Sequence, residues 1–302
     1  MSEQRIGFIG LGNMGGRMAR QITEAGVDLL GFDPRTEAIT EAGGRAAASA
    51  AEVIESTDVV LMSLPDSAVV EAVLYADRAI DRAHEGQVIV DLSTANPEST
   101  RRIAADLSGK GAAYLDAGIS GGAAAAEKGA LTLMVGGAAD ALEKVRGVLE
   151  HFSTKIAHCG ASGAGHTVKL LNNFLNAIAL SATAEVMVAA KKADLDLATT
   201  LDVINASSGV NFATTNRFPH IIEGDYLEGG LTNTLMLKDV SLYLELLAGL
   251  GVTSLNAPGP VASFGLARQL GYADRISNTV VDAIGDVSGG VRLHEQSPEE
   301  NA

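Results

Sequence analysis

The chain is poor in the features that mark disulfide-bonded, nucleic-acid-binding or membrane proteins. Its 302 residues include one cysteine, Cys159, so an internal disulfide is excluded and a reducing, cytoplasmic location is expected. Its 22 lysines and arginines are outnumbered by 37 aspartates and glutamates, and the formal net charge of −15 disfavours nucleic acid and anionic membranes as partners. The same global field repels anionic small molecules, so an anionic substrate must be held by local groups.

Other common signatures are missing too. No basic segment followed by an apolar run opens the chain, and the apolar stretch 174–190 is interrupted by polar residues, which predicts a buried core helix. The six histidines form no metal-site spacing with cysteine or carboxylates, and no G-x-S-x-G motif occurs. Glycine, in contrast, is abundant, with 34 residues. Its placement carries most of the functional signal.

The first glycine cluster follows a short apolar run, Arg5–Ile9, and precedes a helical pattern from Met14 to Ala25. A G-x-G-x-x-G turn between a strand and a helix is the fingerprint of a dinucleotide site. Gly10 permits the tight turn, Gly12 lets the backbone approach a pyrophosphate, and Gly15 lets the helix pack on the strand. The residues expected to contact the cofactor are Gly10, Leu11, Gly12, Asn13, Met14 and Gly15.

Asp33 stands at the end of the second predicted strand, 27–32. This is close to the offset of about 20 residues at which a carboxylate binds the adenosine ribose of NAD. Because that carboxylate repels a 2′-phosphate, NAD is favoured, although Arg35 could bind such a phosphate and keeps NADP possible. The alternative is that Asp33 only forms a turn before Pro34. We expect Asp33, Pro34 and Arg35 to border the cofactor.

Predicted strands alternate with helical patterns through the rest of the first half, which is typical of βαβ units and a parallel sheet. Ligands bind beyond the carboxyl ends of such strands. Two residue pairs stand there, after the predicted strands 58–63 and 87–91: Leu64 with Pro65, and Ser93 with Thr94. We expect Leu64, Pro65 and Thr94 to line the cofactor and Ser93 to contact substrate. Ser93 or Thr94 could instead cap the helix that begins at Pro97.

A second glycine cluster, Ser120-Gly121-Gly122, follows the predicted strand that starts at Tyr114. Consecutive backbone N–H groups in such a turn form an anion-binding nest, and a substrate carboxylate is the expected guest. A flexible loop is the alternative.

The third cluster, Gly160 to Gly165, runs directly into a long helical pattern. Lys169 and Asn173 lie four residues apart near its start, so a helix places them on one face. A cation with an amide beside it suits a general acid acting on a carbonyl oxygen. The alternative is an ordinary surface lysine among helix polar residues.

After Gly165 the patterns are helical, at 168–193, 197–206, 234–250 and 261–270. The length allows two domains, and we expect an α/β domain at 1–163 and an all-α domain at 164–302. Lys238-Asp239 lies early in the third helix, where it could contact a ligand or face solvent. The polar, acidic tail from Asp286 to Ala302 is expected to be frayed or disordered.

Four stretches, in this order, resemble the signatures of the β-hydroxyacid dehydrogenase family, which includes 3-hydroxyisobutyrate dehydrogenases and small semialdehyde reductases. The resemblance extends from Ile6 to about Ile284 and rests on these segments: Phe8 to Gly15; Asp116 to Gly122 with Gly129 to Gly137; Gly160 to Asn173; and Leu237 to Val240.

The resemblance implies a Rossmann domain joined by one long helix to a helical domain, with the site in the cleft between them. It implies an NAD- or NADP-dependent enzyme that interconverts a small 3-hydroxy acid and its semialdehyde, as a dimer or tetramer packed through the helical domain. The roles it implies are proton transfer by Lys169, substrate orientation by Asn173, carboxylate binding by Ser120, Gly121 and Gly122, substrate contact by Lys238 and Asp239, and cofactor contact by Lys238.

The chain also departs from the family pattern. Gly118 stands where the family usually has proline, and Gly165-His166-Thr-Val-Lys169 also resembles 6-phosphogluconate dehydrogenases, which carry His-Asn in place of Asn172-Asn173. That family is the main alternative. An imine reductase or a non-catalytic NAD-binding protein is disfavoured because Lys169 is retained. The motifs shared by the whole family do not specify which acid is the substrate. We expect side chains near residues 207–212 to select it.

Overall fold

The computed structural model describes residues 4–76 and 78–294, which form two compact units. The first extends to Lys169 and the second begins at Leu170, so this division lies inside helix α8 (Ala164–Lys192). In the described residues, the first unit contains two buried apolar clusters and the second contains one.

The first unit is built on an eight-stranded sheet with the order β3-β2-β1-β4-β5-β6-β7-β8. The first six strands follow the order of doubly wound dinucleotide-binding sheets, in which ligands bind where the strand order reverses. The strands are β1 (Ile6–Ile9), β2 (Leu29–Phe32), β3 (Arg45–Ala46), β4 (Val59–Met62), β5 (Val88–Asp91), β6 (Ala113–Ser120), β7 (Leu131–Gly136) and β8 (Ser153–Gly160).

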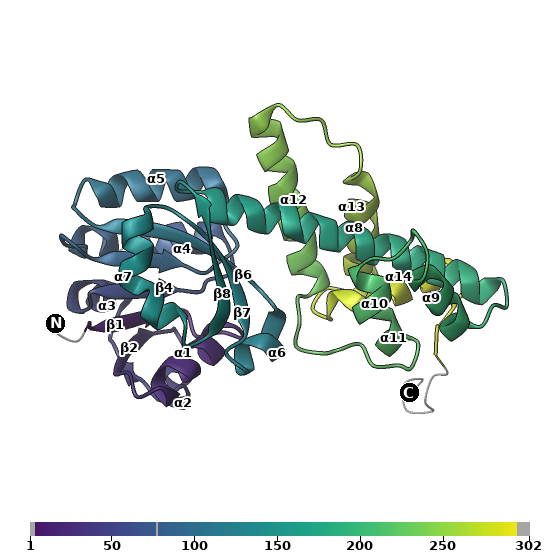
Figure 1. Cartoon of the computed structure of the whole chain (residues 1–302), viewed down its shortest axis with the longest axis horizontal. Helices are drawn as coiled ribbons and strands as arrows, with labels where there is room; N and C mark the ends of the chain where they lie inside the picture. Colours follow the sequence, from purple (N-terminus) through teal and green to yellow (C-terminus); the bar gives the residue numbers. More distant parts are fainter. Residues whose placement is uncertain (1–3, 77, 295–302) are drawn as a thin grey trace. The chain divides into compact units, whose positions relative to one another are not determined.

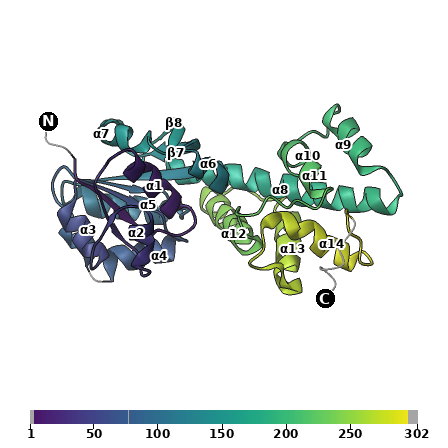
Figure 2. The ribbon, with the colours of Figure 1, turned by 90° about the horizontal axis from the view of Figure 1, so that it is seen from below.

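Helices cover both faces of this sheet (Figure 1, Figure 2). Because strand side chains alternate, Phe8 of β1 enters one buried cluster and Ile9 enters the other. The helices are α1 (Gly15–Glu24), α2 (Glu37–Glu41), α3 (Ala50–Ser56), α4 (Ser67–Tyr75), the 3₁₀ turn η1 (Ala79–Arg82), α5 (Pro97–Ser108), α6 (Gly122–Glu127) and α7 (Ala139–Leu149).

The sheet differs from the sequence prediction at β6 to β8, and it also includes the two-residue strand β3, which was not predicted. Strands β6 and β7 pair antiparallel, because residues 121–130 are too short for the crossover of a dozen or more residues that a parallel connection needs. Strand β8 was not predicted, since its mostly exposed or half-exposed side chains give no apolar run. The helix at Pro97 is capped by Asn96, so the alternative that Ser93 or Thr94 caps it is wrong.

The second unit is helical in its described residues, apart from one isolated bridge, Thr232 to Ile276. Its buried cluster includes Met187, Phe218, Met236 and Phe264. The predicted α/β plus all-α fold class is confirmed. The segments after α8 are α9 (Leu197–Asn205), α10 (Phe212–Asn216), α11 (Phe218–Ile221), α12 (Asn233–Leu250), α13 (Pro258–Ala267), the π turn η2 (Arg268–Tyr272), the 3₁₀ turn η3 (Ser277–Thr279) and α14 (Val280–Val287).

By length and composition alone, helix α8 could cross a membrane. However, 56% of its most apolar 18-residue segment is buried inside the structure, as in a core helix. The predicted disordered tail is wrong for its first part. Helix α14 continues to Val287, and Leu293 is buried at 4% exposure. Residues 295–302 lie outside the described residues.

Candidate active site

The turn after β1 has the geometry that a bound pyrophosphate requires. Gly10 has a φ of +87°, and a Cβ there would lie 2.4 Å from the carbonyl oxygen of Ser63. A Cβ on Gly15 would lie 2.0 Å from the carbonyl oxygen of Gly10, so helix α1 can pack this closely only through glycine. Gly12 faces open space, with nothing within 4 Å of a Cβ. The backbone at Gly12 is therefore open to a phosphate at the start of α1.

Asp33 closes this turn from the end of β2. Its carboxylate accepts the backbone N–H groups of Leu11 (2.7 Å) and Arg35 (2.9 Å), and the Arg35 Nε lies 3.7 Å from it. The carboxylate is thus held beside the glycine turn, where it can still accept ribose hydroxyls. The Arg35 side chain, which also donates to the carbonyl of Leu11 (3.3 Å), lies at the same corner.

The segment Ser120–Gly122 ends β6 and begins α6. Gly121 and Gly122 have φ values of +127° and +68°, which side chains rarely adopt. A Cβ on Gly121 would lie 2.6 Å from the Ala125 Cβ, whereas one on Gly122 would project into open space. The backbone at Gly122 is therefore accessible to a ligand, as the predicted carboxylate nest requires.

The start of α8 is fixed by a carboxylate and by glycines. Asp116 of β6 is fully buried and accepts the N–H groups of Gly163 and His166, both at 2.8 Å, which satisfies helix donors that lack internal partners. A Cβ on Gly165 would lie 2.3 Å from the Met134 carbonyl oxygen. The glycines of this motif thus let the helix begin directly against the sheet.

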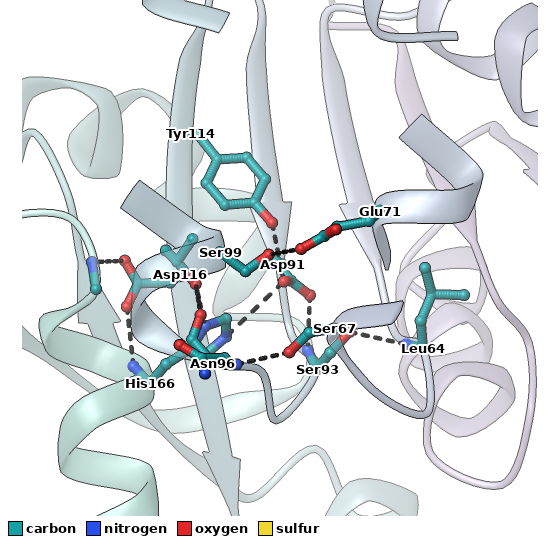
Figure 3. A network of polar contacts seen from close by, with 12 residues as sticks. Leu64, Ser67, Glu71, Asp91, Ser93, Asn96, Ser99, Tyr114, Asp116 and His166 are labelled. Atoms are coloured by element: carbon teal, nitrogen blue, oxygen red, sulfur yellow. Dashed lines mark hydrogen bonds and ion pairs between the residues drawn. The ribbon is translucent and has the colours of Figure 1, made fainter. Parts of the chain in front are cut away.

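A buried polar network continues from Asp116 (Figure 3). The ring Nδ1 of His166 lies 2.8 Å from the Thr100 hydroxyl, and its Nε2 lies 3.9 Å from Asp91. Asp91 accepts the Tyr114 hydroxyl (2.9 Å), and burial is the main cause that raises the pKa of Tyr114 well above its ordinary value. These residues were not predicted as a group. The sequence marks them by a carboxylate within two neighbouring apolar strands, Asp91 in β5 and Asp116 in β6.

Ser93 belongs to the same network. It is 4% exposed, and its hydroxyl accepts the N–H of Leu64 at 2.9 Å, which ties together the loops after β4 and β5. A structural role is therefore established for Ser93, and its contact with substrate stays a prediction.

The stem of Lys169 packs against β6 at Gly118. A Cβ on Gly118 would lie 2.5 Å from the Lys169 Cβ and 3.0 Å from its Cγ, so this approach requires glycine. Gly118 and Ser120 are two residues apart on one strand, so they share a face of the sheet. The lysine stem therefore lies on the same face of β6 as Ser120, two residues before the nest.

In the second unit, Asn173 is held by Asp239 of α12. Its side-chain N–H donates to the Asp239 carboxylate, which is 1% exposed and lies 3.2 Å from the Lys238 Nζ. This bond directs the amide oxygen of Asn173 away from Asp239. On α8, Asn173 lies one turn after Lys169 on the same face. The described residues contain no cluster of three or more His, Cys, Asp or Glu that could hold a metal.

Known proteins match both halves of the chain. Residues 5–160 match the family model for the NAD binding domain of 6-phosphogluconate dehydrogenase, and residues 163–275 match that for NAD-binding of NADP-dependent 3-hydroxyisobutyrate dehydrogenase. The NAD-dependent L-serine dehydrogenase of Pseudomonas aeruginosa is 37% identical over 284 residues, 90% of this chain and 95% of the relative. The 2-(hydroxymethyl)glutarate dehydrogenase of Eubacterium barkeri is 36% identical over 245 residues, 80% of this chain and 81% of the relative.

A solved structure agrees with these relatives. The 3-hydroxyisobutyrate dehydrogenase of Mycobacterium tuberculosis, solved with L-serine, superposes with a TM-score of 0.84 at 30% identity, covering 93% of this chain and 99% of that chain. The family models and these relatives define an NAD-dependent oxidoreductase. The chain belongs to the β-hydroxyacid dehydrogenase family, and it acts on hydroxy acids with NAD as cofactor, in a family that also has NADP-dependent members.

Proposed function

We propose that the chain interconverts 3-hydroxy acids of the form HOCH₂–CH(R)–COO⁻ and their semialdehydes O=CH–CH(R)–COO⁻, at a site built around Lys169. The hydroxy acids in the names of the three relatives share this frame and differ in R, which is methyl, ammonium or carboxyethyl. The observation that carries the proposal is that the aliphatic part of the Lys169 side chain packs against Gly118, close to the Ser120–Gly122 nest.

Each group then has one task. The Gly10–Gly15 turn and Asp33 would hold NAD, which would supply the hydride acceptor for the CH₂OH carbon. The Lys169 amine accepts the hydroxyl proton in oxidation and returns it to the carbonyl oxygen in reduction. The nest holds the carboxylate by backbone N–H groups, and Asn173, held by Asp239, orients the substrate. Lys238 is proposed to contact substrate and cofactor.

A panel of these acids with NAD, followed by nicotinamide absorbance, tests the activity. We expect NADH to form with at least one acid of this frame, and not with the analogue in which the hydroxyl is replaced by hydrogen. The proposal would be contradicted if none of these acids were oxidised and none of the corresponding semialdehydes were reduced.

Cofactor preference is predicted from Asp33. We expect a higher kcat/KM with NAD than with NADP, because the Asp33 carboxylate repels a 2′-phosphate. The substitution Asp33→Ala should reduce that ratio by about tenfold or more, the equivalent of roughly 1.4 kcal/mol. The exposed Asp194→Ala serves as the control and should leave the ratio unchanged. Equal use of both cofactors by the wild-type chain would refute the assignment.

We also propose that the chain is a cytoplasmic homodimer or homotetramer that associates through its helical unit. Large apolar side chains exposed on that unit support this, among them Leu195 (53%), Val203 (61%), Phe212 (60%) and Leu255 (80%). A native mass equal to one 31.0 kDa chain would contradict it.

A further inference from the structure

Arg217 is a largely buried arginine between α10 and α11 that is held by neutral groups. Its Nη1 donates to the Asn278 Oδ1 at 2.7 Å, and its Nη2 donates to the Asn176 Oδ1 at 3.0 Å. The Phe212 ring covers the guanidinium at 5.8 Å. Among residues 4–76 and 78–294, no carboxylate forms an ion pair with it.

A buried charge without a counterion is costly, and buried charges in proteins are normally paired. Burial lowers the pKa of Arg217 to about 10, so the guanidinium is still charged near neutral pH. The two amides use two of its five N–H groups. The Asn278 amide is itself fixed, because its N–H donates to the Tyr226 carbonyl at 2.8 Å. The guanidinium is therefore a held cation with donors left for an anion.

Its position relates it to the substrate. Asn176 lies seven residues after Lys169 and three after Asn173 on α8, so all three share one helix face. The rise from Asn173 to Asn176 is about 4.5 Å along the helix axis. Arg217 thus lies against the α8 face that carries Lys169 and Asn173, one turn beyond Asn173.

We infer that Arg217 binds a second carboxylate in the R group of the substrate, so that the chain prefers dicarboxylic 3-hydroxy acids over monocarboxylic ones. The inference rests on the proposed function and names its substrate class. A planar guanidinium fork is the usual partner of a carboxylate. With the net charge of −15, local recognition of this kind is what a dianionic substrate needs. An ammonium R group, as in L-serine, should be disfavoured by the same cation.

The test compares two acids that differ only in R, methyl and carboxyethyl. For the wild-type chain we expect kcat/KM to be at least tenfold higher for the carboxyethyl acid. Arg217→Gln should lower the carboxyethyl value by about 10- to 100-fold, as expected for a charge-assisted pair, and change the methyl value less than threefold. The exposed Arg268→Gln removes the same charge and should change neither value.

Equal losses for both acids in Arg217→Gln, or a wild-type preference for the methyl acid, would overturn the inference. If Arg217→Gln does not fold, Arg217→Lys, which keeps the charge but loses the fork, should show a smaller loss confined to the carboxyethyl acid. If neither acid is oxidised, the proposed function fails. A binding measurement then still tests whether Arg217 recognises a second carboxylate. Glutarate, but not butyrate, should then raise the wild-type Tm in the presence of NADH. No difference between them would overturn it.

Discussion

Lys169→Ala should lower kcat by about 10²–10⁴-fold, roughly 3–5 kcal/mol of transition-state stabilisation. The loss follows from removing the group that exchanges a proton with the substrate oxygen while hydride moves at carbon. Binding of NADH should change little, because the Gly10–Gly15 turn and Asp33 hold the cofactor independently of the lysine. Steady-state turnover and NADH titration measure the two effects separately.

Three further variants test whether the loss of turnover comes from the missing lysine amine. Lys169→Arg should not restore turnover, because the pKa of a guanidinium lies far above neutrality and makes it a poor proton donor. Asn173→Ala should cost less than Lys169→Ala, since it removes orientation but leaves the proton source. Lys191→Ala, at an exposed position on the same helix, is the matched control and should behave as wild type. Wild-type turnover in Lys169→Ala would show that the lysine takes no part in proton transfer.

Gly122→Val should lower kcat/KM by about 10²-fold or more, because charge-assisted hydrogen bonds to a carboxylate contribute about 1.5–3 kcal/mol each. The valine side chain would occupy the open space in front of the nest and strain a backbone with φ of +68°. Amidation of the substrate carboxylate should produce a loss of similar size in the wild-type chain.

Gly86→Val separates this effect from strain. Gly86 has a φ of +81° and nothing within 4 Å of a Cβ, but it lies in the loop before β5. Both valine variants should lose stability, by about 1–3 kcal/mol from strain. Normal kinetics in Gly86→Val together with the loss in Gly122→Val support the nest. Normal kinetics in Gly122→Val would refute it.

The fold was predictable from the sequence wherever one local rule decided it. The G-x-G-x-x-G turn requires a strand before it and a helix after it, and apolar runs predicted β1, β2, β4 and β5 to within two residues at each end. Strand β8 escaped prediction because it is half exposed, and the antiparallel β6–β7 pair depends on a connection length rather than on a residue pattern.

The site was predictable only in part, for a related reason. Motif spacing identified Lys169, Asn173 and the nest as candidates, since each depends on neighbours a few residues away. The contacts that position them join distant segments. Asp116 meets Gly163 and His166, Gly118 meets Lys169, and Arg217 meets Asn176 and Asn278. No periodicity in the chain encodes such pairs, so Arg217 was not singled out in the sequence.

Proton exchange by Lys169 is tested most directly by the pH dependence of kcat/KM for oxidation. For the wild-type chain, kcat/KM should fall toward low pH as the base takes up a proton. In Lys169→Ala, assayed at higher enzyme concentration, the slow residual reaction should lack that decline. A Lys169→Ala profile that keeps the wild-type decline at the same pH would contradict this role of Lys169, because another group would then be the base.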